Sequence, residues 1–359
     1  MYSYAELKHF AKQIFLKMGC SETHAETTAT NLLSADLRGV DSHGVARLSG
    51  YVRLWEAGRI NPTPNIRIVH ESPSTAVVDG DAGLGMVVAD FAMKVAIEKA
   101  KVAGTGWVSV RNSNHYGIAG QYAMQALEHD QIGWAMTNAS PLVAPTFAAE
   151  RLLGTNPIAI AIPADKQPAF VADFATTTAA NGKLEILQRK NQDAPTGWMQ
   201  TADGQPATDS NTVKNGGALL PLGGDRQHGS HKGYALGAIV DIFSAVLSGA
   251  NYGPFVPPFV SYVPLHPNPV GEGLGHFFGA MRVDAFRPAS EFKSHMDNWI
   301  ETFRKAKTTS EADQVLIPGD VERQATAERL RDGIYLLEPV VKDLGQLAEK
   351  FAVPAPTAL

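Results

Sequence analysis

The spacing of apolar residues changes twice along the chain, and these changes limit the folds that it can adopt. Up to about residue 60, apolar residues such as Leu7, Phe10 and Ile14 recur at the spacing of a helix. From residue 66 short apolar runs alternate with helical ones, and after residue 286 the helical spacing returns. We therefore expect a mixed α/β (α+β) protein in which the helical segments 1–65 and 287–359 pack together.

The second half of the chain contains three segments whose composition predicts a particular environment. The helical run from His231 to Leu247 is apolar on nearly every face, so it is predicted to be buried. The polar, Gly-rich stretch from Lys190 to Gly229 is long for a loop inside a compact domain, and such loops are often functional. The Pro- and Gly-rich stretch from Pro254 to Gly275 is predicted to cover or gate a site.

Composition and charge narrow the class of protein. The chain has 36 acidic and 31 basic residues, a net charge of −5 and no basic run, which argues against a nucleic-acid partner. No apolar stretch reaches the ~18 residues of a membrane-spanning helix, so we expect no membrane partner. The chain starts with a polar, helix-like segment, and its single cysteine, Cys20, has no partner for an internal disulfide. We therefore expect a cytoplasmic protein.

Two short segments place a histidine where a loop meets a helix. His43 and His115 both stand among small residues and hydrogen-bonding side chains. An imidazole titrates near neutral pH, so it can accept a hydroxyl proton and return it. Arg47 follows His43 by one helical turn, and its planar guanidinium suits a carboxylate. The pattern predicts acid–base chemistry on a small oxyacid, and exposed helix-cap residues without a catalytic role are the alternative interpretation.

The sequence motifs that could bind a cofactor or a metal are each less specific than the two histidine segments. The nearest match to a dinucleotide fingerprint begins at Gly83 and lacks the third glycine, so a dinucleotide would be bound without the standard fold. Lys232 at the start of a helix can hold a phosphate, and the residues 173–176 can approach a pyrophosphate, although a solvated turn and a helix cap explain them equally. His228 and His231 have no third ligand at a recognisable spacing, so no metal is predicted.

Taken together, these segments resemble the malate/L-lactate dehydrogenase family, a type-2 group unrelated to the Rossmann-fold lactate dehydrogenases. The resemblance runs from about residue 3 to residue 350. Relatives in the family include ureidoglycolate dehydrogenase, sulfolactate dehydrogenase, diketogulonate reductase and the cyclic imino-acid reductases. The motifs that carry the resemblance occur in the family's order and are Asp41-Ser42-His43-Gly44, Asn114-His115-Tyr116-Gly117, Gly154-Thr155-Asn156-Pro157, Asp173-Phe174-Ala175-Thr176 and His231-Lys232-Gly233-Tyr234.

The resemblance implies a non-Rossmann fold with a central, largely antiparallel sheet, flanked by helical segments from both termini. Residues 66–130 would form a mixed α/β domain on the substrate side, and residues 131–286 the nicotinamide-binding domain. A homodimer is implied, with the active site near the subunit interface. By matching position, His115 and His43 would be catalytic, and Ser42 and Arg47 would bind the substrate. The residues implied to contact the cofactor, NAD or NADP, are Ser140, Asp173, Phe174, Ala175, Thr176, His231, Lys232, Pro318, Gly319 and Asp320.

The predicted function is reversible hydride transfer between NAD or NADP and a small 2-hydroxy/2-oxo acid, with malate or L-lactate as the first candidates. An NADPH-dependent reductase of a cyclic ketimine carboxylate and a ureidoglycolate-type dehydrogenase are alternatives on the same scaffold. Two alternatives come from other classes of protein. One is a metal-dependent hydrolase built on His228 and His231, and the other is a binding protein that has lost catalysis.

Overall fold

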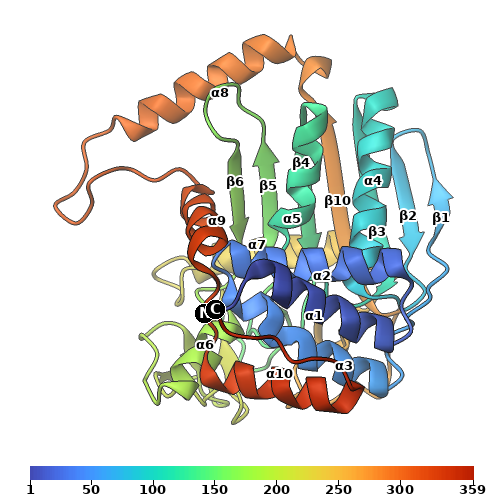
Figure 1. The fold of residues 1–359 in the computed structure, drawn as a ribbon. Helices are drawn as coiled ribbons and strands as arrows, with labels where there is room; N and C mark the ends of the chain where they lie inside the picture. The colour runs from blue at the N-terminus through green and yellow to red at the C-terminus, as the bar shows by residue number, and fades with distance from the viewer.

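The computed structural model describes residues 1–359, and its two termini lie close together at the helical end of the molecule (Figure 1). The helices there are α1 (Tyr4–Lys17), α2 (Glu22–Leu37), α3 (Leu48–Glu56) and α10 (Glu338–Phe351). They share a cluster of 26 buried apolar residues that includes Leu7, Leu32, Leu48 and Leu344. Each of α1 and α2 begins with a serine side chain that accepts a backbone N–H, as expected of helix caps. The N-terminal helices and the C-terminal helix α10 thus share one apolar core.

A seven-stranded sheet forms the centre of the molecule, with the order β1-β2-β3-β10-β4-β5-β6. All neighbouring strands are antiparallel except β2 and β3, so the predicted, largely antiparallel sheet is confirmed. The sheet takes strands from both sides of residue 130, so the expected boundary between 66–130 and 131–286 runs through one sheet. The strands are β1 (Arg67–Glu71), β2 (Thr75–Asp79), β3 (Thr105–Ser113), β4 (Gln131–Thr137), β5 (Ile158–Ile162), β6 (Phe170–Phe174) and β10 (Leu274–Arg282).

One face of this sheet is covered by α4 (Gly85–Ala103) and α5 (Gly120–Ala123), as Figure 1 shows. The core between them is rich in alanine and valine side chains, and the aromatic rings of Tyr116, Tyr122 and Phe278 are buried in it. A Cβ on Gly106 would lie 2.0 Å from the carbonyl oxygen of Ala96, so α4 approaches β3 as closely as only a glycine allows. This close packing holds the start of β3 against α4. Beyond the other end of β3, a Cβ on Gly85 of α4 would lie 2.0 Å from the carbonyl oxygen of Asn114.

The opposite face of the sheet contacts α7 (Ser230–Asp241) and a following π-helical turn (Ile242–Val246). The sequence predicts that this helix is buried, and the structure shows this to be wrong for its outer side. Residues of the π-helical turn and beyond are exposed, among them Val246 at 56% and Leu247 at 57%. Gly237, Val240 and Ala245 make up part of the side packed on the sheet. The helix is apolar on all sides, so the side that faces away from the sheet is an apolar surface that no other part of this chain covers.

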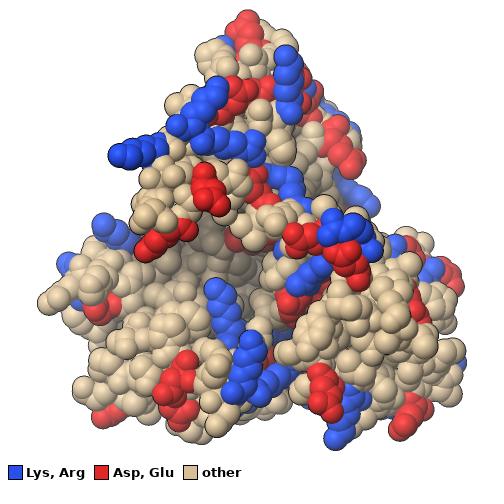
Figure 2. Space-filling model, turned by 60° about the vertical axis from the view of Figure 1, so that its left-hand side comes forward, with Lys and Arg blue, Asp and Glu red and all other residues tan.

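The C-terminal segment 287–359 divides between the two ends of the molecule, which departs from the expectation that all of it packs with 1–65. Helix α9 (Asp320–Asp332) contacts α2, whereas α8 (Ala289–Arg304) lies at the far end of the sheet (Figure 1). Asp297 of α8 explains this placement, because its carboxylate accepts the backbone N–H groups of residues 165–167 at 2.9–3.1 Å. The surface between the α8 end and the helical end is deeply hollowed, with Lys and Arg side chains at its lower edge (Figure 2).

The segment from Lys190 to Gly229 contains regular structure of its own. A three-stranded sheet with the order β8-β7-β9 is formed by β7 (Met199–Gln200), β8 (Pro206–Ala207) and β9 (Ala218–Leu219). Helix α6 (Asn181–Arg189) precedes it. Leu184 of this helix shares an apolar cluster with Met199 of β7 and Leu219 of β9. No helix of the protein combines the length and the apolar character needed to cross a membrane.

Candidate active site

His43 and His115, the two histidines that the family resemblance implies to be catalytic, lie side by side in one cavity. Their ring centroids are 5.7 Å apart and their planes are inclined by 23°. His43 ends a short 3-10 helix (Asp41–His43) between α2 and α3, and His115 stands in the loop between β3 and α5. The cavity has a volume of about 60 Å³, and Arg47, Ser140 and Phe259 also line it. Two segments that are 72 positions apart in sequence thus meet at one place.

A buried carboxyl group fixes the loop that carries His43. The Oδ2 atom of Asp36 accepts the backbone N–H of Val45 at 2.7 Å. A Cβ on Gly44 would lie 2.2 Å from this carboxyl group, so the motif requires a glycine directly after His43. Complete burial raises the pKa of Asp36 to about 8, and the Val45 N–H opposes part of that rise.

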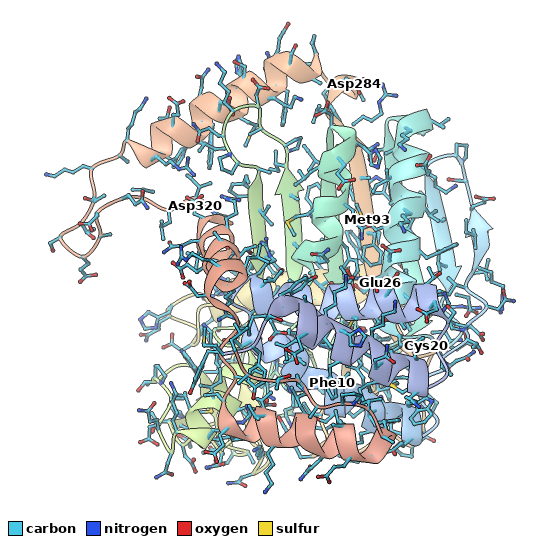
Figure 3. All side chains as sticks on the ribbon, in the orientation of Figure 1. Phe10, Cys20, Glu26, Met93, Asp284 and Asp320 are labelled. Carbon is cyan, nitrogen blue, oxygen red and sulfur yellow. The ribbon has the colours of Figure 1, made fainter.

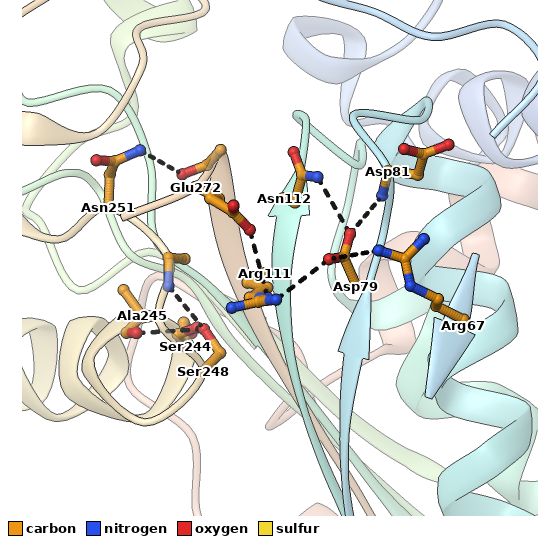
Figure 4. Close-up of polar contacts among 12 residues, drawn as sticks. Arg67, Asp79, Asp81, Arg111, Asn112, Ser244, Ala245, Ser248, Asn251 and Glu272 are labelled. Atoms are coloured by element: carbon orange, nitrogen blue, oxygen red, sulfur yellow. Dashed lines mark hydrogen bonds and ion pairs between the residues drawn. The ribbon is translucent and has the colours of Figure 1, made fainter. Parts of the chain in front are cut away.

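A second buried carboxylate, that of Asp79 at the end of β2, fixes the loop that carries His115 (Figure 4). Asp79 accepts hydrogen bonds from Asn112 Nδ2 at 3.1 Å and from the backbone of Asp81 at 2.9 Å. Its other oxygen pairs with Arg67 at 3.4 Å and with Arg111 at 3.3 Å. Asn112 adopts a φ of +54°, which turns the chain out of β3. The pKa of Asp79 is lowered by these hydrogen bonds and cations despite its burial, so it stays charged.

The turn after β3 is further held from within the protein. Asn114 donates from Nδ2 to the carbonyl oxygens of Ala82 and Gly83 at 2.9 and 3.0 Å. The ring of Tyr116 stacks on the buried ring of His276, with centroids 4.7 Å apart and an angle of 5°. His276 bonds the hydroxyls of Thr137 and Ser113, each at 2.7 Å. Burial lowers the pKa of His276 to about 3, so this ring supports the turn as a neutral imidazole.

The immediate partner of His115 is a residue that the sequence analysis did not identify. Tyr51 of α3 places its hydroxyl 2.6 Å from Nδ1 of His115. Phe259 covers the same imidazole, with ring centroids 4.6 Å apart. The backbone N–H of Gly117 also points at Nδ1, at 3.4 Å, so Nδ1 accepts hydrogen bonds in this arrangement. Nε2 is free to accept a proton in the other tautomer, which donates from Nδ1 to the Tyr51 oxygen. Tyr51 belongs to the apolar stripe of a helix and Phe259 to the Pro- and Gly-rich segment 254–275, so only the tertiary contact reveals their role.

The second histidine, His43, is oriented by its neighbour in sequence, because Ser42 Oγ lies 2.8 Å from its Nδ1 atom. Burial and the Arg47 guanidinium lower the pKa of His43 to about 4. The pKa of His115 is lowered well below its usual value by burial, and then by His43, Arg47 and His276. Each ring keeps part of its surface open to the cavity. The cavity therefore offers two neutral imidazoles at pH 7.

Arg47 lies in the cavity as predicted, but its guanidinium already has partners. Its Nε donates to the carbonyl oxygen of Ser42 at 2.5 Å, which ties the side chain to the His43 loop. The two terminal nitrogens pair with the two carboxylate oxygens of Glu185, at 3.2 and 3.1 Å. The fork of Arg47 thus holds a carboxylate in bidentate fashion, and that carboxylate belongs to the protein.

Of the residues implied to contact the cofactor, Ser140 lies in the catalytic cavity itself, and its Oγ accepts the N–H of Phe259 at 2.9 Å. The segment 173–176 follows β6. Asp173 accepts the N–H of Gly120 at 2.7 Å, and burial raises its pKa to about 6. Phe174 is 40% exposed, and Ala175 is partly exposed. Thr176 donates to the carbonyl oxygen of Thr155, a residue that lines the cavity.

His231 and Lys232 stand in the first turn of α7, outside the lining of the catalytic cavity. No side chain caps this helix, and its N-cap residue Gly229 has a φ of +98°. His231 Nδ1 lies 3.0 Å from a guanidinium nitrogen of Arg226, and Lys232 is exposed. The backbone N–H groups of Ser230 and Lys232 donate to the carbonyl oxygens of Asp225 and Gly229, so it is mainly the cations beside this helix N-terminus that suit a phosphate. The second histidine considered for a metal pair, His228, bonds Asp225, and no group of three or more His, Cys, Asp or Glu side chains that suits a metal occurs in residues 1–359.

The turn Pro318-Gly319-Asp320 begins α9, where Figure 3 labels Asp320. None of these three residues lines the cavity of the two histidines. The carbonyl oxygen of Pro318 accepts the N–H of Val171, which joins the turn to β6. Gly319 has a φ of +98°. The Asp320 carboxylate accepts the N–H of Ile317 at 2.8 Å and pairs with arginine side chains at 2.8 and 2.5 Å. The structure therefore gives Asp320 a role within its own turn.

The chain is similar to known dehydrogenases over nearly its whole length. The sequence is 43% identical to a malate dehydrogenase of Pyrococcus horikoshii, over 96% of this chain and 93% of that protein. It is 37% identical to an L-sulfolactate dehydrogenase of Methanocaldococcus jannaschii, over 95% of this chain and 94% of the relative. The crystal structure of a malate dehydrogenase from Entamoeba histolytica superposes with a TM-score of 0.91 at 36% identity, with 99% of both chains covered.

The sequence model of the family described as malate/L-lactate dehydrogenase matches residues 2–345. This range contains both histidine loops, Arg47, the central sheet and all the residues implied to contact the cofactor. With two neutral imidazoles and an arginine fork in one cavity of a non-Rossmann fold, the chain belongs to the malate/L-lactate dehydrogenase family.

Proposed function

We propose that this protein transfers a hydride between a nicotinamide cofactor and a small 2-hydroxy/2-oxo acid, with malate as the first candidate. The observation that carries the proposal is the stacked pair of His43 and His115 beside the guanidinium of Arg47. A proton acceptor and a carboxylate fork within one small cavity are the two groups that oxidation of a 2-hydroxy acid needs from a protein. The malate dehydrogenase named above supports malate before L-lactate.

In the oxidative direction, Nε2 of His115 would accept the hydroxyl proton while the hydride leaves the same carbon for the cofactor. Tyr51 holds the ring of His115 in place through Nδ1 during this transfer. The neutral ring of His43 would donate a hydrogen bond to the substrate oxygen. Arg47 would bind the carboxylate and so place C2 of the acid against His115, and Ser42 keeps both Arg47 and His43 oriented.

The cofactor would lie along the path from the catalytic cavity to the start of α7. Thr155 and Thr176 mark this path, because Thr155 lines the cavity and Gly237 of α7 approaches Thr176 so closely that a Cβ on it would lie 3.0 Å from the hydroxyl. The uncapped N-terminus of α7 with Lys232 and His231 fits the phosphates. When bound, the nicotinamide supplies or accepts the hydride. Lys232 is also the residue most suited to a ribose phosphate, which would favour NADP if it makes that contact.

The decisive assay follows the absorbance of NADH and of NADPH with a panel of acids. We expect consumption of one reduced cofactor with oxaloacetate, weaker consumption with pyruvate, and none without an acid. Cyclic ketimine carboxylates form the second half of the panel. Turnover of those compounds alone would replace the proposal by an imine reductase. Silence with every compound, together with no quenching of protein fluorescence by either cofactor, would reject it.

We also propose that the protein is a homodimer, because one apolar face remains uncovered in the single chain. The face is formed by Tyr234, Ile239, Ile242, Phe243, Val246 and Leu247, which are 40–57% exposed. Contiguous apolar patches of this kind mark interfaces, and the sequence pattern of this helix is that of a buried one. A second copy of the same face would bury it.

Leu247→Asp tests this assembly by placing a charge in the uncovered face. We expect sedimentation equilibrium to give twice the chain mass of 38.4 kDa for the wild type and the single mass for the variant. Leu330→Asp is the matched control, since Leu330 lies on α9 and is 59% exposed, against 57% for Leu247. A monomeric wild type, or a dimer that survives Leu247→Asp, would contradict the proposed interface.

We keep the cytoplasm as the proposed location. The one cysteine of the chain, Cys20, is a buried free thiol. Burial raises its pKa to about 11, so the thiolate does not form near neutral pH. This use of cysteine fits a reducing compartment.

A further inference from the structure

We propose that the carboxylate of Glu185 occupies the position on Arg47 at which the carboxylate of the substrate binds. Glu185 must leave this position when the acid binds, and this competition sets the apparent affinity for the acid. This inference rests on the proposed function, because it takes Arg47 as the binding residue. The contact is bidentate, with N–O distances of 3.2 and 3.1 Å. It has the geometry by which an arginine binds the carboxylate of a ligand.

The pair lies inside the protein rather than on its surface. The side chains of Arg47 and Glu185 are 16% and 21% exposed. Asn181 donates from Nδ2 to Oε1 of Glu185 at 2.9 Å, and Tyr262 in turn donates its hydroxyl to Asn181 at 2.8 Å. Glu185 is therefore held in place by its own helix and by the segment at residue 262.

The charge of Arg47 explains why a carboxylate is held there without substrate. A half-buried guanidinium needs a counter-ion, because removing its water costs free energy that only an anion offsets. The neighbouring imidazoles of His43 and His115 provide no negative charge for Arg47, because both have lowered pKa values and are neutral. An incoming acid carries the same group as Glu185, so the two anions compete for one fork.

The present cavity is too small for substrate and nicotinamide together. Its volume is about 60 Å³, whereas sites for small ligands enclose roughly 300–1,000 Å³. Helix α6 forms part of its wall through Asn181 and Gly182. A Cβ on Gly182 would lie 2.3 Å from Cβ of Ser42, so α6 rests directly against the His43 loop. Movement of Glu185 away from Arg47 releases one of the contacts that hold this wall.

The structure also contains the place to which Glu185 can move. A second cavity of about 550 Å³ borders the same ion pair, and Arg47 and Glu185 line it together with Arg189 and Lys214. Neither Arg189 nor Lys214 forms an ion pair within the chain, whereas Glu185 pairs with Arg47, and Asp343 is the other carboxylate that lines this cavity. Arg189 follows Glu185 by four residues on α6, the spacing at which opposite charges pair on a helix. Glu185 thus pairs with Arg47 in the present arrangement, and after moving away from Arg47 it would have two unpaired cations, Arg189 and Lys214, as partners.

Glu185→Gln keeps the shape and the bond to Asn181 but removes the competing charge. We expect KM for oxaloacetate to fall about fivefold with kcat nearly unchanged, because the seat on Arg47 is then free in more of the molecules. Glu291→Gln is the matched control, since Glu291 forms an exposed ion pair with Arg287 on α8. A rise in KM would overturn the proposal, because it would show that Glu185 positions Arg47 for the acid.

A double variant tests the second position of Glu185. Arg189→Ala with Lys214→Ala is expected to raise KM about fivefold in the wild-type background, and to leave KM unchanged when Glu185→Gln is present. Equal effects in both backgrounds would overturn the two-position scheme. Calorimetry with oxalate provides a readout without turnover, and Glu185→Gln should bind it about fivefold more tightly. Equal oxalate binding refutes this inference, whereas inactivity with all acids refutes the proposed function instead.

Discussion

His115→Ala is expected to lower the rate of hydroxy-acid oxidation by about 10²–10⁴-fold, the usual contribution of a positioned general base. The imidazole is the group that would remove the hydroxyl proton, and Tyr51 at 2.6 Å holds it for that purpose. Cofactor binding should be unchanged, since the proposed phosphate site at Lys232 lies outside the catalytic cavity. Turnover and quenching of protein fluorescence by the reduced cofactor measure the two properties separately.

The pH dependence of the same reaction gives an independent test. A base must be neutral to accept a proton, so oxidation is lost as the pH falls through the pKa of His115 in the folded protein. Burial and the charge of Arg47 lower this pKa well below its usual value. The rate should therefore stay level from pH 8 to below about 6.5, the ordinary pKa of histidine, and decline only in more acidic solution. A midpoint at or above that value would contradict the assignment.

The control for this experiment is His129→Ala, because His129 is an exposed histidine on the 3-10 helix (Met124–His129) that follows α5. We expect its turnover and pH profile to match the wild type. Tyr51→Phe separates orientation from proton transfer. It removes the hydroxyl at Nδ1 and should lower kcat less than His115→Ala does, with the inflection in the pH profile displaced. An unchanged profile in Tyr51→Phe would show that the hydroxyl does not influence the base.

The sequence predicts the catalytic pair because the chemistry is local to two short motifs. His43 and His115 each stand in a loop with its own small and capping residues, and each loop adopts its turn largely through neighbours in sequence. Gly44 shows this for the His43 loop, since the contact with Asp36 leaves no room for a side chain. The His115 loop is held in addition by Asp79 and by His276 from elsewhere in the chain. The resemblance to the family then supplies the order of the motifs and, with it, the fold.

The residues that the sequence does not reveal are those that act across long distances in the chain. His276 of β10 supports Tyr116 from a strand inserted between β3 and β4, and nothing near position 276 indicates that pairing. Phe259 reaches His115 from a Pro-rich segment predicted only to cover a site. The ion pair of Arg47 with Glu185 joins residues 138 positions apart. Such contacts depend on topology, which spacing in a single sequence does not encode.

The helix from His231 to Leu247 shows a different limit. Its apolar character on all sides is real, but the prediction of burial holds only for the side that faces the sheet. A sequence pattern records every surface that is removed from water, whether by the same chain or by another. One chain alone therefore misreports the environment of a helix that lies at an interface, which is why the exposed side supports a dimer here.

Arg47→Ala is expected to lower kcat/KM by about 10²–10³-fold, mainly through KM, because the acid loses its bidentate partner in a partly buried site. A second effect adds to the loss. The carboxylate of Glu185 stays in the wall of the cavity without its cation and repels the incoming anion. The kcat/KM of Arg47→Lys should lie between that of the wild type and that of Arg47→Ala, because lysine restores the positive charge without the planar guanidinium.

The double variant Arg47→Ala with Glu185→Gln separates these two contributions. If the stranded carboxylate adds to the defect, the double variant recovers part of the activity that Arg47→Ala loses, and the two substitutions are not additive. Steady-state kinetics with oxaloacetate, beside thermal unfolding of each variant, measures this coupling and shows whether the fold is retained. A wild-type kcat/KM in Arg47→Ala would refute the carboxylate seat, and with it the competition by Glu185, because both require that the acid binds to this one guanidinium.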